Sequence, residues 1–243
     1  MITPRRLVPL VAVLLMAASL AACGSSTKTP KAEKSQCTYA QDPAGAAKKV
    51  SPPPGNLPSD LPASITIATN HGDIEVSLDS QHAPCTVNAF VSLAKQGYFD
   101  NTHCHRLTTQ GIYVLQCGAP RATGKPGDTP GHLQGGPGFT IKDELVDNDP
   151  RLQPCRGSLA SGQQVCTYTA GTVAMANAGP DTGGSQFFLV YQDSPLKNAY
   201  TAFGKMSAAG VQVVRGIAKG GAYPPDSNGN TAPRLETAIT SVK

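Results

Sequence analysis

The chain has 243 residues, a formal net charge of +4 and an aromatic content of 5%, with no tryptophan. Its positive charges form no basic block and are not interleaved with aromatic residues, so we expect no nucleic-acid partner. Its apolar run at residues 7–20 is too short to cross a bilayer comfortably as a helix.

The first residues are typical of an export signal. Arg5 and Arg6 precede the apolar run, which ends in Leu20-Ala21-Ala22-Cys23. This ending resembles a bacterial lipobox, in which the signal is cut before the cysteine and the cysteine sulfur receives a diacylglycerol. The resemblance implies a signal peptide over 1–22, lipidation at Cys23 and a protein tethered to the outer face of the cell membrane. The alternative is an ordinary secretory signal with an incidental cysteine.

Residues 23–63 are rich in Ser, Thr, Lys, Ala and Pro, and include Pro52-Pro53-Pro54-Gly55 near the end. A segment with so few large apolar residues cannot offset the entropy lost on ordering. We therefore expect a flexible spacer that holds the folded part away from the lipid surface. Residues 64–243 are ample for one domain with a substantial core.

The domain begins with alternating apolar and polar residues over 64–69 and 73–78, and the Asn70-His71-Gly72 turn between them predicts a β-hairpin. Apolar residues then recur at helical spacing from Pro84 to a stop at Gly97, which predicts a helix. After a glycine- and proline-rich excursion we expect short strands at 139–141, 172–175, 187–191 and 201–205, a helix around 211–218 and a closing strand at 235–242. This pattern favours a closed β-barrel over a sandwich without excluding the sandwich.

This domain contains three sequence motifs. They are Cys104-His105-Arg106-Leu107, then Tyr113-Val114-Leu115-Gln116-Cys117-Gly118, and finally Met175-Ala176-Asn177-Ala178-Gly179-Pro180 followed by Gly184-Ser185-Gln186-Phe187-Phe188. In this order and spacing they closely resemble the cyclophilin family of peptidyl-prolyl cis-trans isomerases. The resemblance runs from about Ser64 to the C-terminus. It implies a mainly β fold, a closed eight-stranded antiparallel barrel with an α-helix capping each end.

The resemblance also implies roles for individual residues. Arg106 matches the family's catalytic arginine, whose guanidinium contacts the proline amide. The other matches are the proline-pocket positions Tyr113, Val114, Phe188 and Leu196, the orienting glutamines Gln116 and Gln186, the substrate-pairing edge Ala176 and Asn177, the groove-rim residue His105, and Tyr200, which aligns with a frequent pocket histidine. As an alternative, Tyr113 and Val114 are ordinary barrel residues and Ile112 fills the pocket. Phe187 is expected in the core, because adjacent strand residues face opposite sides.

The chemistry of the reaction explains these residue types. The bond before proline rotates over a barrier of about 18–20 kcal/mol, and rotation makes the proline nitrogen more basic. A catalyst needs an apolar slot for the ring, a fixed donor that favours the twisted amide, and polar groups that hold the flanking backbone; a permanently charged arginine fork suits the donor role. No cofactor, metal or nucleophile is implied. We expect a monomer that acts on proline-containing polypeptides, chiefly newly exported proteins.

The chain departs from the family pattern in two places that bear on function. The spacing from Arg106 to Gln116 is longer than usual, so the turn between them is enlarged. The position where many eukaryotic members carry tryptophan aligns near Pro195. Because a missing tryptophan removes a large apolar contact and a hydrogen-bond donor, we expect only weak cyclosporin binding.

Six cysteines remain besides Cys23, and an even number in an exported protein favours disulfides over metal. They are Cys37, Cys85, Cys104, Cys117, Cys155 and Cys166. Fifteen pairings are possible. We favour Cys155–Cys166, which would staple a polar insertion, and Cys104–Cys117, which would link the strands around the first motif. Cys37–Cys85 then follows by elimination. His103 and His105 share a strand face, but no third ligand is evident, so no metal site is predicted.

Two other functions compete with isomerisation. A proline-peptide binding module or chaperone would use the same groove without turnover, but binding alone does not require Arg106. A substrate-binding lipoprotein of a transporter usually has two larger α/β lobes, whereas this chain is too short and too rich in strands.

Overall fold

The computed structural model describes residues 36–146, 149, 151–158, 164–226, 229 and 231–243. Contacts within the chain divide it into two units, Met1–Glu33 and Lys34–Lys243, and all described residues belong to the second. The predicted signal peptide and the lipidation site Cys23 lie outside the described residues. Within the described part, no helix is long and apolar enough to span a membrane.

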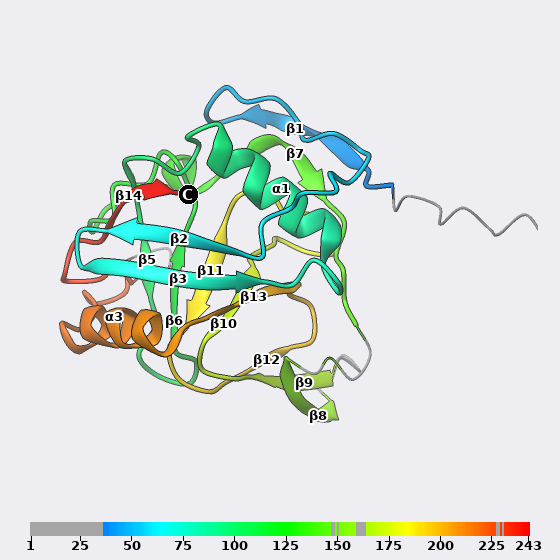
Figure 1. Cartoon of the computed structure of the whole chain (residues 1–243). Coiled ribbons are helices and arrows are strands. Elements are labelled where there is room, and N and C mark those ends of the chain that lie inside the picture. Colours follow the sequence, from blue (N-terminus) through cyan, green and yellow to red (C-terminus); the bar gives the residue numbers. More distant parts are fainter. Residues whose placement is uncertain (1–35, 147–148, 150, 159–163, 227–228, 230) are drawn as a thin grey trace, which may run out of the picture. The chain divides into compact units, whose positions relative to one another are not determined.

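A nine-stranded antiparallel sheet forms the centre of the described unit, in the order β4-β14-β2-β3-β13-β10-β11-β6-β5 (Figure 1). Its strands are β2 (Ser64–Thr69), β3 (Gly72–Leu78), β4 (Thr102–His103), β5 (Arg106–Leu107), β6 (Val114–Cys117), β10 (Thr172–Met175), β11 (Phe187–Val190), β13 (Ala202–Met206) and β14 (Ala238–Val242). The predicted hairpin is confirmed as β2 and β3, which pair from Ser64↔Ser77 to Thr69↔Gly72.

The sheet is strongly curled, and the way its edges meet differs from the expected closed eight-stranded barrel. The edge strands β4 and β5 follow each other along the chain and are separated only by Cys104 and His105. The Cys104 amide donates to the carbonyl of Thr237 beside β14, whereas the next amide, of His105, donates to Gln116 on β6. The chain thus changes partner between two consecutive residues. No ladder joins β4 to β5 among the described residues, and the structure is a curled sheet of nine strands.

Both predicted helices are present. Helix α1 (Pro84–Lys95) begins with proline, whose fixed φ and missing N–H suit the first helical position. Helix α3 (Ala208–Lys219) begins after Ser207, whose hydroxyl accepts the Gly210 amide at 3.1 Å. α1 packs against β7 (Pro137–Ile141) and β14, and α3 packs against β3 and β13. A four-residue helix, α2 (Pro130–Leu133), lies in the glycine-rich excursion.

The chain has few aromatic residues, and many of them lie in the main core. Phe90 of α1 stacks on Phe99 with ring centroids 4.8 Å apart and meets Phe187 edge-on at 5.2 Å. A second, smaller core contains Phe188, together with Tyr168. Phe187 is therefore a core residue, as predicted, and its neighbour Phe188 points to the other side of β11. Burying each such ring contributes on the order of 1.5–3 kcal/mol.

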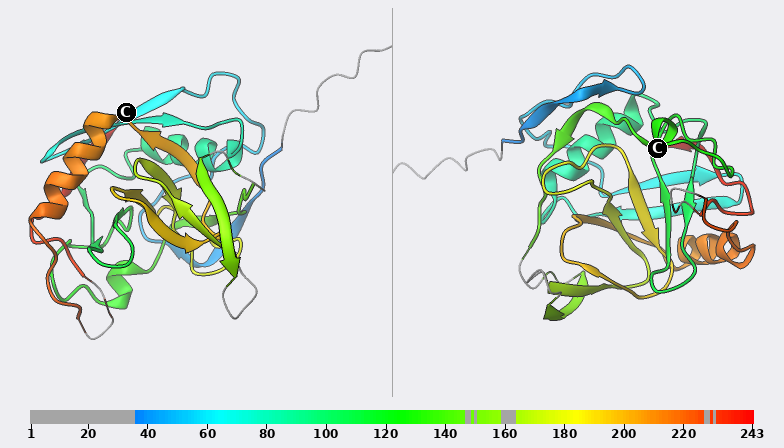
Figure 2. Two further views of the ribbon diagram at one scale, coloured as in Figure 1. Left: turned by 90° about the horizontal axis from the view of Figure 1, so that it is seen from below. Right: turned by 180° about the vertical axis from the view of Figure 1, so that it is seen from behind.

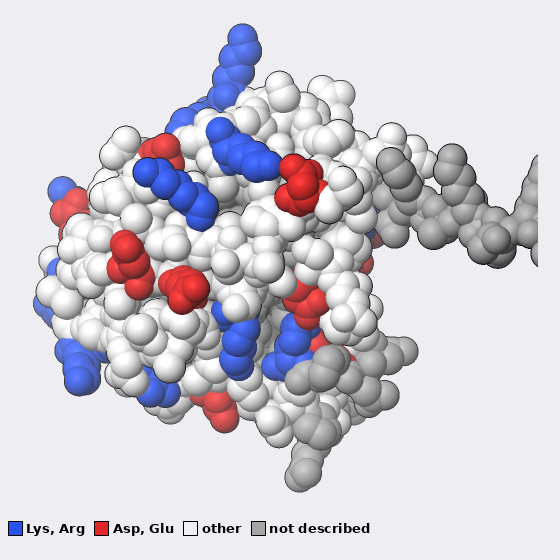
Figure 3. Space-filling model, in the orientation of Figure 1, with Lys and Arg blue, Asp and Glu red and all other residues white. Residues whose placement is uncertain are grey.

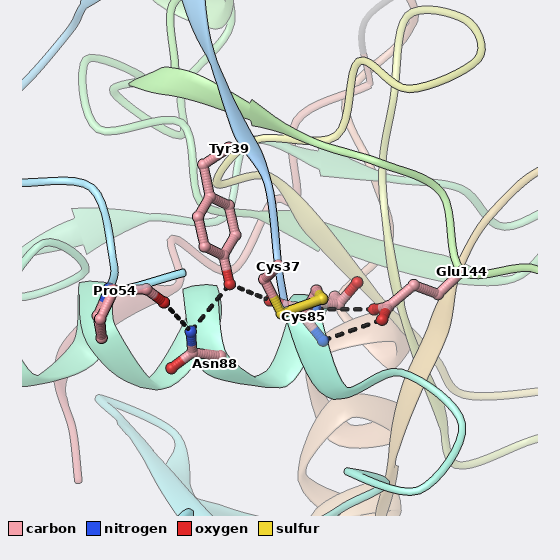
Figure 4. The surroundings of a disulfide bond; sticks show 7 residues. Cys37, Tyr39, Pro54, Cys85, Asn88 and Glu144 are labelled. Carbon is pink, nitrogen blue, oxygen red and sulfur yellow. Dashed lines mark hydrogen bonds between the residues drawn. A yellow bond between two sulfur atoms is a disulfide. The ribbon is translucent and has the colours of Figure 1, made fainter. Parts of the chain in front are cut away.

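The segment before residue 64 differs from the expected flexible spacer. From Gln36 onward the described chain lies against the domain, where β1 (Tyr39–Ala46) pairs with β7 beside α1 (Figures 1 and 2). The Cys37–Cys85 disulfide ties its start to α1, and the Tyr39 hydroxyl donates to the Cys85 carbonyl at 3.0 Å (Figure 4). A disulfide and polar contacts fix this segment rather than a large apolar face, which is why its composition does not predict order.

A third sheet carries the stapled hairpin. Strands β8 (Leu152–Ser158) and β9 (Gln164–Tyr168) pair with each other, and β9 also pairs with β12 (Ser194–Lys197). Cys155 and Cys166 join β8 to β9, and Cys104 and Cys117 join the residue between β4 and β5 to β6. With Cys37–Cys85, all three favoured disulfide pairings are confirmed.

Candidate active site

A pocket of about 200 Å³, here called the Arg106 pocket, opens where β5, β6, β11 and β12 approach one another. Its lining residues are Arg106, Ile112, Val114, Gln116, Ala176, Asn177, Phe188, Leu196 and Tyr200. Alternation along β6 turns Val114 and Gln116 to the same side, while Leu115 between them enters the main core. The pocket thus combines apolar side chains with four polar or charged ones, Arg106, Gln116, Asn177 and Tyr200, a mixture that suits a small apolar group flanked by polar atoms.

Hydrogen bonds fix the guanidinium of Arg106. Arg106 and Gln116 are paired across β5 and β6, and Arg106 Nη1 donates to Gln116 Oε1 at 3.2 Å. Gln116 Nε2 donates in turn to Gln186 Oε1 at 2.9 Å, and Gln186 Nε2 donates to the Leu133 carbonyl at 2.7 Å. Burial lowers the pKa of Arg106, and nearby Tyr200 opposes that shift. Because the ordinary pKa of an arginine lies far above neutral pH, Arg106 remains a positioned cation despite this lowering.

One wall of the Arg106 pocket packs against the hairpin of β8 and β9. Leu196 of β12 pairs with Cys166 of β9, so the Cys155–Cys166 disulfide lies beside Leu196 on the same face of this sheet. The Tyr200 ring meets Phe188 edge-on at 5.4 Å. Because these side chains pack in the smaller core with Cys155 and Cys166, the shape of the pocket depends on how the hairpin is placed.

Asn177 lies between the pocket and an acidic loop. Its Nδ2 donates to the Ala199 carbonyl at 2.7 Å and contacts Asp143 Oδ1 at 3.4 Å. The Ala176 amide donates to the Gln186 carbonyl at 2.9 Å, which links the third motif to β11. These bonds fix the edge of the pocket formed by Ala176 and Asn177.

Most residues singled out by the family resemblance lie together in this pocket. Eight of them line it: Arg106, Val114, Gln116, Ala176, Asn177, Phe188, Leu196 and Tyr200. Gln186 does not line the Arg106 pocket but borders the adjacent one.

Tyr113 and His105 do not lie where the resemblance put them. The Tyr113 ring packs against Tyr191, with centroids 5.9 Å apart, and Ile112 lines the pocket, as the alternative interpretation had it; that alternative is wrong for Val114, which lines the pocket as well. His105 is buried, with 3% of its surface exposed, and is not on a groove rim. Alternation explains both: Ile112 shares the side of Val114, and His105 points away from the side of Arg106. Burial lowers the pKa of His105 to about 4, the Arg106 charge adds to this, and Asp128 opposes it.

A second pocket of about 550 Å³, here called the Asp42 pocket, adjoins the first and shares Gln116, Ala176 and Asn177 with it. Its other lining residues include Gln186 and, from β1, Asp42 and Pro43. The backbone beside this pocket is packed so closely at Gly118 that only glycine fits. Its φ is +90°, and an added Cβ would lie 2.2 Å from the Ser185 carbonyl oxygen. The sequence does not predict the contribution of β1, because its composition conceals the strand.

On the face drawn in Figure 3, the charges of the described residues give no sign of a polyanion site. Lysine, arginine, aspartate and glutamate are interspersed over the face drawn in Figure 3. Among the residues that the structure describes, no group of three or more His, Cys, Asp or Glu is placed to hold a metal ion.

Comparison with known proteins agrees with the fold and the site. Residues 64–243 match the family model described as cyclophilin type peptidyl-prolyl cis-trans isomerase/CLD, and the chain belongs to this family. It is 43% identical over 216 residues to a probable peptidyl-prolyl cis-trans isomerase B of Mycobacterium leprae, and 42% identical over 214 residues to that of Mycobacterium tuberculosis. These matches cover 85% of the chain in both cases, but only 66% and 63% of the relatives.

In two further comparisons, the match covers most of the length of the other protein. A peptidyl-prolyl cis-trans isomerase of Helicobacter pylori is 38% identical over 160 residues, covering 65% of this chain and 82% of the relative. The crystal structure of a cyclophilin type isomerase from Cryptosporidium parvum superposes with a TM-score of 0.53 at 26% identity, covering 74% of this chain and 95% of that one.

Proposed function

We propose that this chain is a peptidyl-prolyl cis-trans isomerase that accelerates rotation about Xaa-Pro bonds. The observation that carries the proposal is the Arg106 guanidinium, held by Gln116 at a pocket whose apolar members suit a proline ring. The named activity of the bacterial relatives supports it. So does the Cryptosporidium parvum protein of the same fold, whose structure was also determined in the presence of the dipeptide Ala-Pro.

The mechanism follows from what rotation does to the amide. The proline ring enters between Ile112, Val114 and Phe188 and is held while the carbonyl side of the bond turns. As resonance is lost, the proline nitrogen gains basicity, and the Arg106 guanidinium donates a hydrogen bond to it. Because Gln116 already fixes the guanidinium, little reorganisation is needed in the transition state. Donors of this kind contribute about 3–4 kcal/mol in other enzymes, a sizeable part of a barrier of about 18–20 kcal/mol.

The decisive experiment compares turnover with binding in Arg106 variants. We expect Arg106→Ala to lower kcat/KM about 100- to 1000-fold in a proline-peptide isomerisation assay. Arg106→Lys should recover little, because an ammonium lacks the planar fork. The affinity for the same peptide, measured by fluorescence, should change much less. The matched control is Arg121→Ala, which removes an exposed arginine outside the pocket.

Two results would count against the enzyme. Unchanged turnover in Arg106→Ala would remove the proposed mechanism. A folded parent protein that binds proline peptides without accelerating their exchange would instead favour a binding module or chaperone that uses the same pocket.

We also propose that the protein is exported, lipidated at Cys23 and anchored on the outer face of the cell membrane, where its clients are newly exported proteins. Three disulfides in the described unit suit an oxidising compartment, and the lipobox-like Leu20-Ala21-Ala22-Cys23 supports the anchor. In cells fed a labelled fatty acid, the parent should take up label and sediment with membranes, whereas Cys23→Ala should do neither. Label in Cys23→Ala would place the modification elsewhere.

Weak cyclosporin binding and a monomeric state complete the proposal. Pro195 stands near the position of the usual tryptophan, and the chain has no tryptophan that could replace that contact. The inhibition constant should be much weaker than that of a tryptophan-bearing cyclophilin measured alongside. Sedimentation should give the mass of one chain.

A further inference from the structure

The Asp42 pocket has a wall that the family match does not include. The family model matches from residue 64 onward, whereas Asp42 and Pro43 come from β1, well before it. The pocket adjoins the Arg106 pocket through Gln116, Ala176 and Asn177, so a peptide bound at one reaches the other. β1 therefore adds side chains to the surface along which a substrate would lie.

The fold holds this wall in place at both ends. Tyr39 to Gln41 pair with Ile141 to Phe139 of β7, and Ala46 pairs with Pro137. The register is interrupted between Gln41 and Ala46, and the residues in the interruption include Asp42 and Pro43. The Cys37–Cys85 disulfide anchors the strand on one side, and the Ala47 amide, which donates to the Gly136 carbonyl at 2.9 Å, anchors it on the other.

The pocket carries a single charge. Among the described residues that line it, Asp42 alone is charged. One oxygen, Oδ1, accepts the Ala44 amide at 2.9 Å, and no cation in the described part of the chain forms an ion pair with Asp42. The nearest lysine along the chain, Lys48 just after β1, instead donates to the carbonyls of Gly97 and Tyr98.

A second acidic group reinforces this charge. Asn177 lines both pockets, and its side-chain amide contacts Asp143. Asp143 in turn accepts the Asp181 amide at 2.9 Å, so another carboxylate faces the same edge. Asp42 and Asp143 therefore place two negative charges at or beside the Asp42 pocket, whereas the Arg106 cation lies in the adjacent pocket, so a cationic side chain is favoured next to Asp42 itself.

We propose that Asp42 is a specificity-determining residue that favours substrates with lysine or arginine two positions from the proline. Side chains two positions apart in an extended peptide point to the same face and lie about 6.5–7 Å apart, which suits two adjacent pockets. This inference rests on the proposed function, which makes the ligand a proline-containing peptide. The preference for a cationic side chain concerns binding and can be measured without turnover. Partly exposed ion pairs are worth about 0.2–1 kcal/mol, so the expected preference is about 1.5- to 5-fold.

The test uses short proline peptides that carry Lys, norleucine or Glu two positions before the proline, and a matching set with the change two positions after it. Both kcat/KM and Kd are measured for the parent protein, for Asp42→Asn and for Asp60→Asn. Asp42→Asn keeps the oxygen that accepts the Ala44 amide and removes only the charge. Asp60→Asn removes the same charge from an exposed position of the same segment and controls for the net charge.

We expect the order Lys, norleucine, Glu in one of the two sets, lost in Asp42→Asn and kept in Asp60→Asn. Added salt should weaken the preference in the parent protein. Equal values for all three peptides in both sets, or a Lys preference that survives in Asp42→Asn, would overturn the inference. If no peptide is isomerised yet the Asp42-dependent order persists in Kd, the proposed function fails and the recognition site stands. Failure to bind any of the peptides overturns both.

Discussion

The hydroxyl of Tyr168 donates a 2.8 Å hydrogen bond to the carbonyl of Tyr200, a residue of the Arg106 pocket. The same hydroxyl accepts the Tyr200 amide at 3.3 Å. Tyr168 is fully buried at the end of β9, whereas Tyr200 lies on the chain between β12 and β13. One phenol therefore ties the stapled hairpin to the substrate-facing wall.

Tyr168→Phe should weaken this wall without altering the reacting groups. Loss of one buried hydrogen bond costs about 1 kcal/mol of unfolding free energy, and the unpaired Tyr200 carbonyl adds to it. We expect KM to rise about two- to five-fold while kcat changes less, because the wall binds the proline ring and Arg106 is untouched. Steady-state kinetics and denaturant unfolding measure both effects. Tyr223→Phe, outside the pocket, is the control, and a fall in kcat alone would contradict the assignment.

Gln116→Ala should lower turnover through Arg106. The variant removes the acceptor of the guanidinium and also the partner of Gln186. A hydrogen bond to a charged group is worth about 1.5–3 kcal/mol, which corresponds to roughly a ten- to hundred-fold fall in kcat/KM. Gln192→Ala, at an exposed position, should leave the rate unchanged. Near-parent activity in Gln116→Ala would show that the guanidinium is held by other means.

Buried His105 should make stability depend on pH. Its folded pKa is about 4, whereas the unfolded chain takes up a proton near 6.5. The unfolded state therefore binds more protons between these values, and the free energy of unfolding falls as the pH drops from about 6.5 to about 4. At about 1.4 kcal/mol per pKa unit the total is roughly 3 kcal/mol, and this contribution is constant above and below the window.

Urea unfolding across this pH range measures the effect. His105→Gln should flatten the profile between pH 6.5 and 4, whereas His71→Gln, at an exposed position, should not. An unchanged slope in His105→Gln would assign the pH dependence to other groups.

Removal of the Cys37–Cys85 disulfide should free β1 from the domain. The two cysteines are 48 residues apart, so loop-closure entropy predicts a loss of about 4 kcal/mol when both become serine. Hydrogen exchange should show lost protection in β1 and retained protection in the hairpin of β2 and β3. The Cys155/Cys166 double variant closes a shorter loop and is expected to cost about 3 kcal/mol. If the amides of β1 remained protected without Cys37–Cys85, the pairing with β7 alone would suffice to hold the strand.

Local patterns in the sequence were enough for much of the fold and for most of the pocket. Alternation predicts the β2–β3 hairpin, and Pro84 marks the start of α1. The arginine motif and the two parts of the third motif are each runs of consecutive residues. Arg106, Asn177 and Phe188 can therefore be recognised without knowing how the chain folds. Such signals involve residues only a few positions apart, so they can be read from the sequence without the fold.

Tertiary structure decided what depends on partners far along the chain. Ile112 rather than Tyr113 enters the pocket because the ladder with β11 fixes which residues of β6 face it. His105 is buried because the chain changes partner beside it, from β14 to β6. Asp42 reaches the second pocket only through the pairing of β1 with β7, about a hundred residues away in sequence. Local composition carries little information about a contact whose energy comes from two distant segments at once, and so the sequence alone determined the motifs while the fold decided what surrounds them.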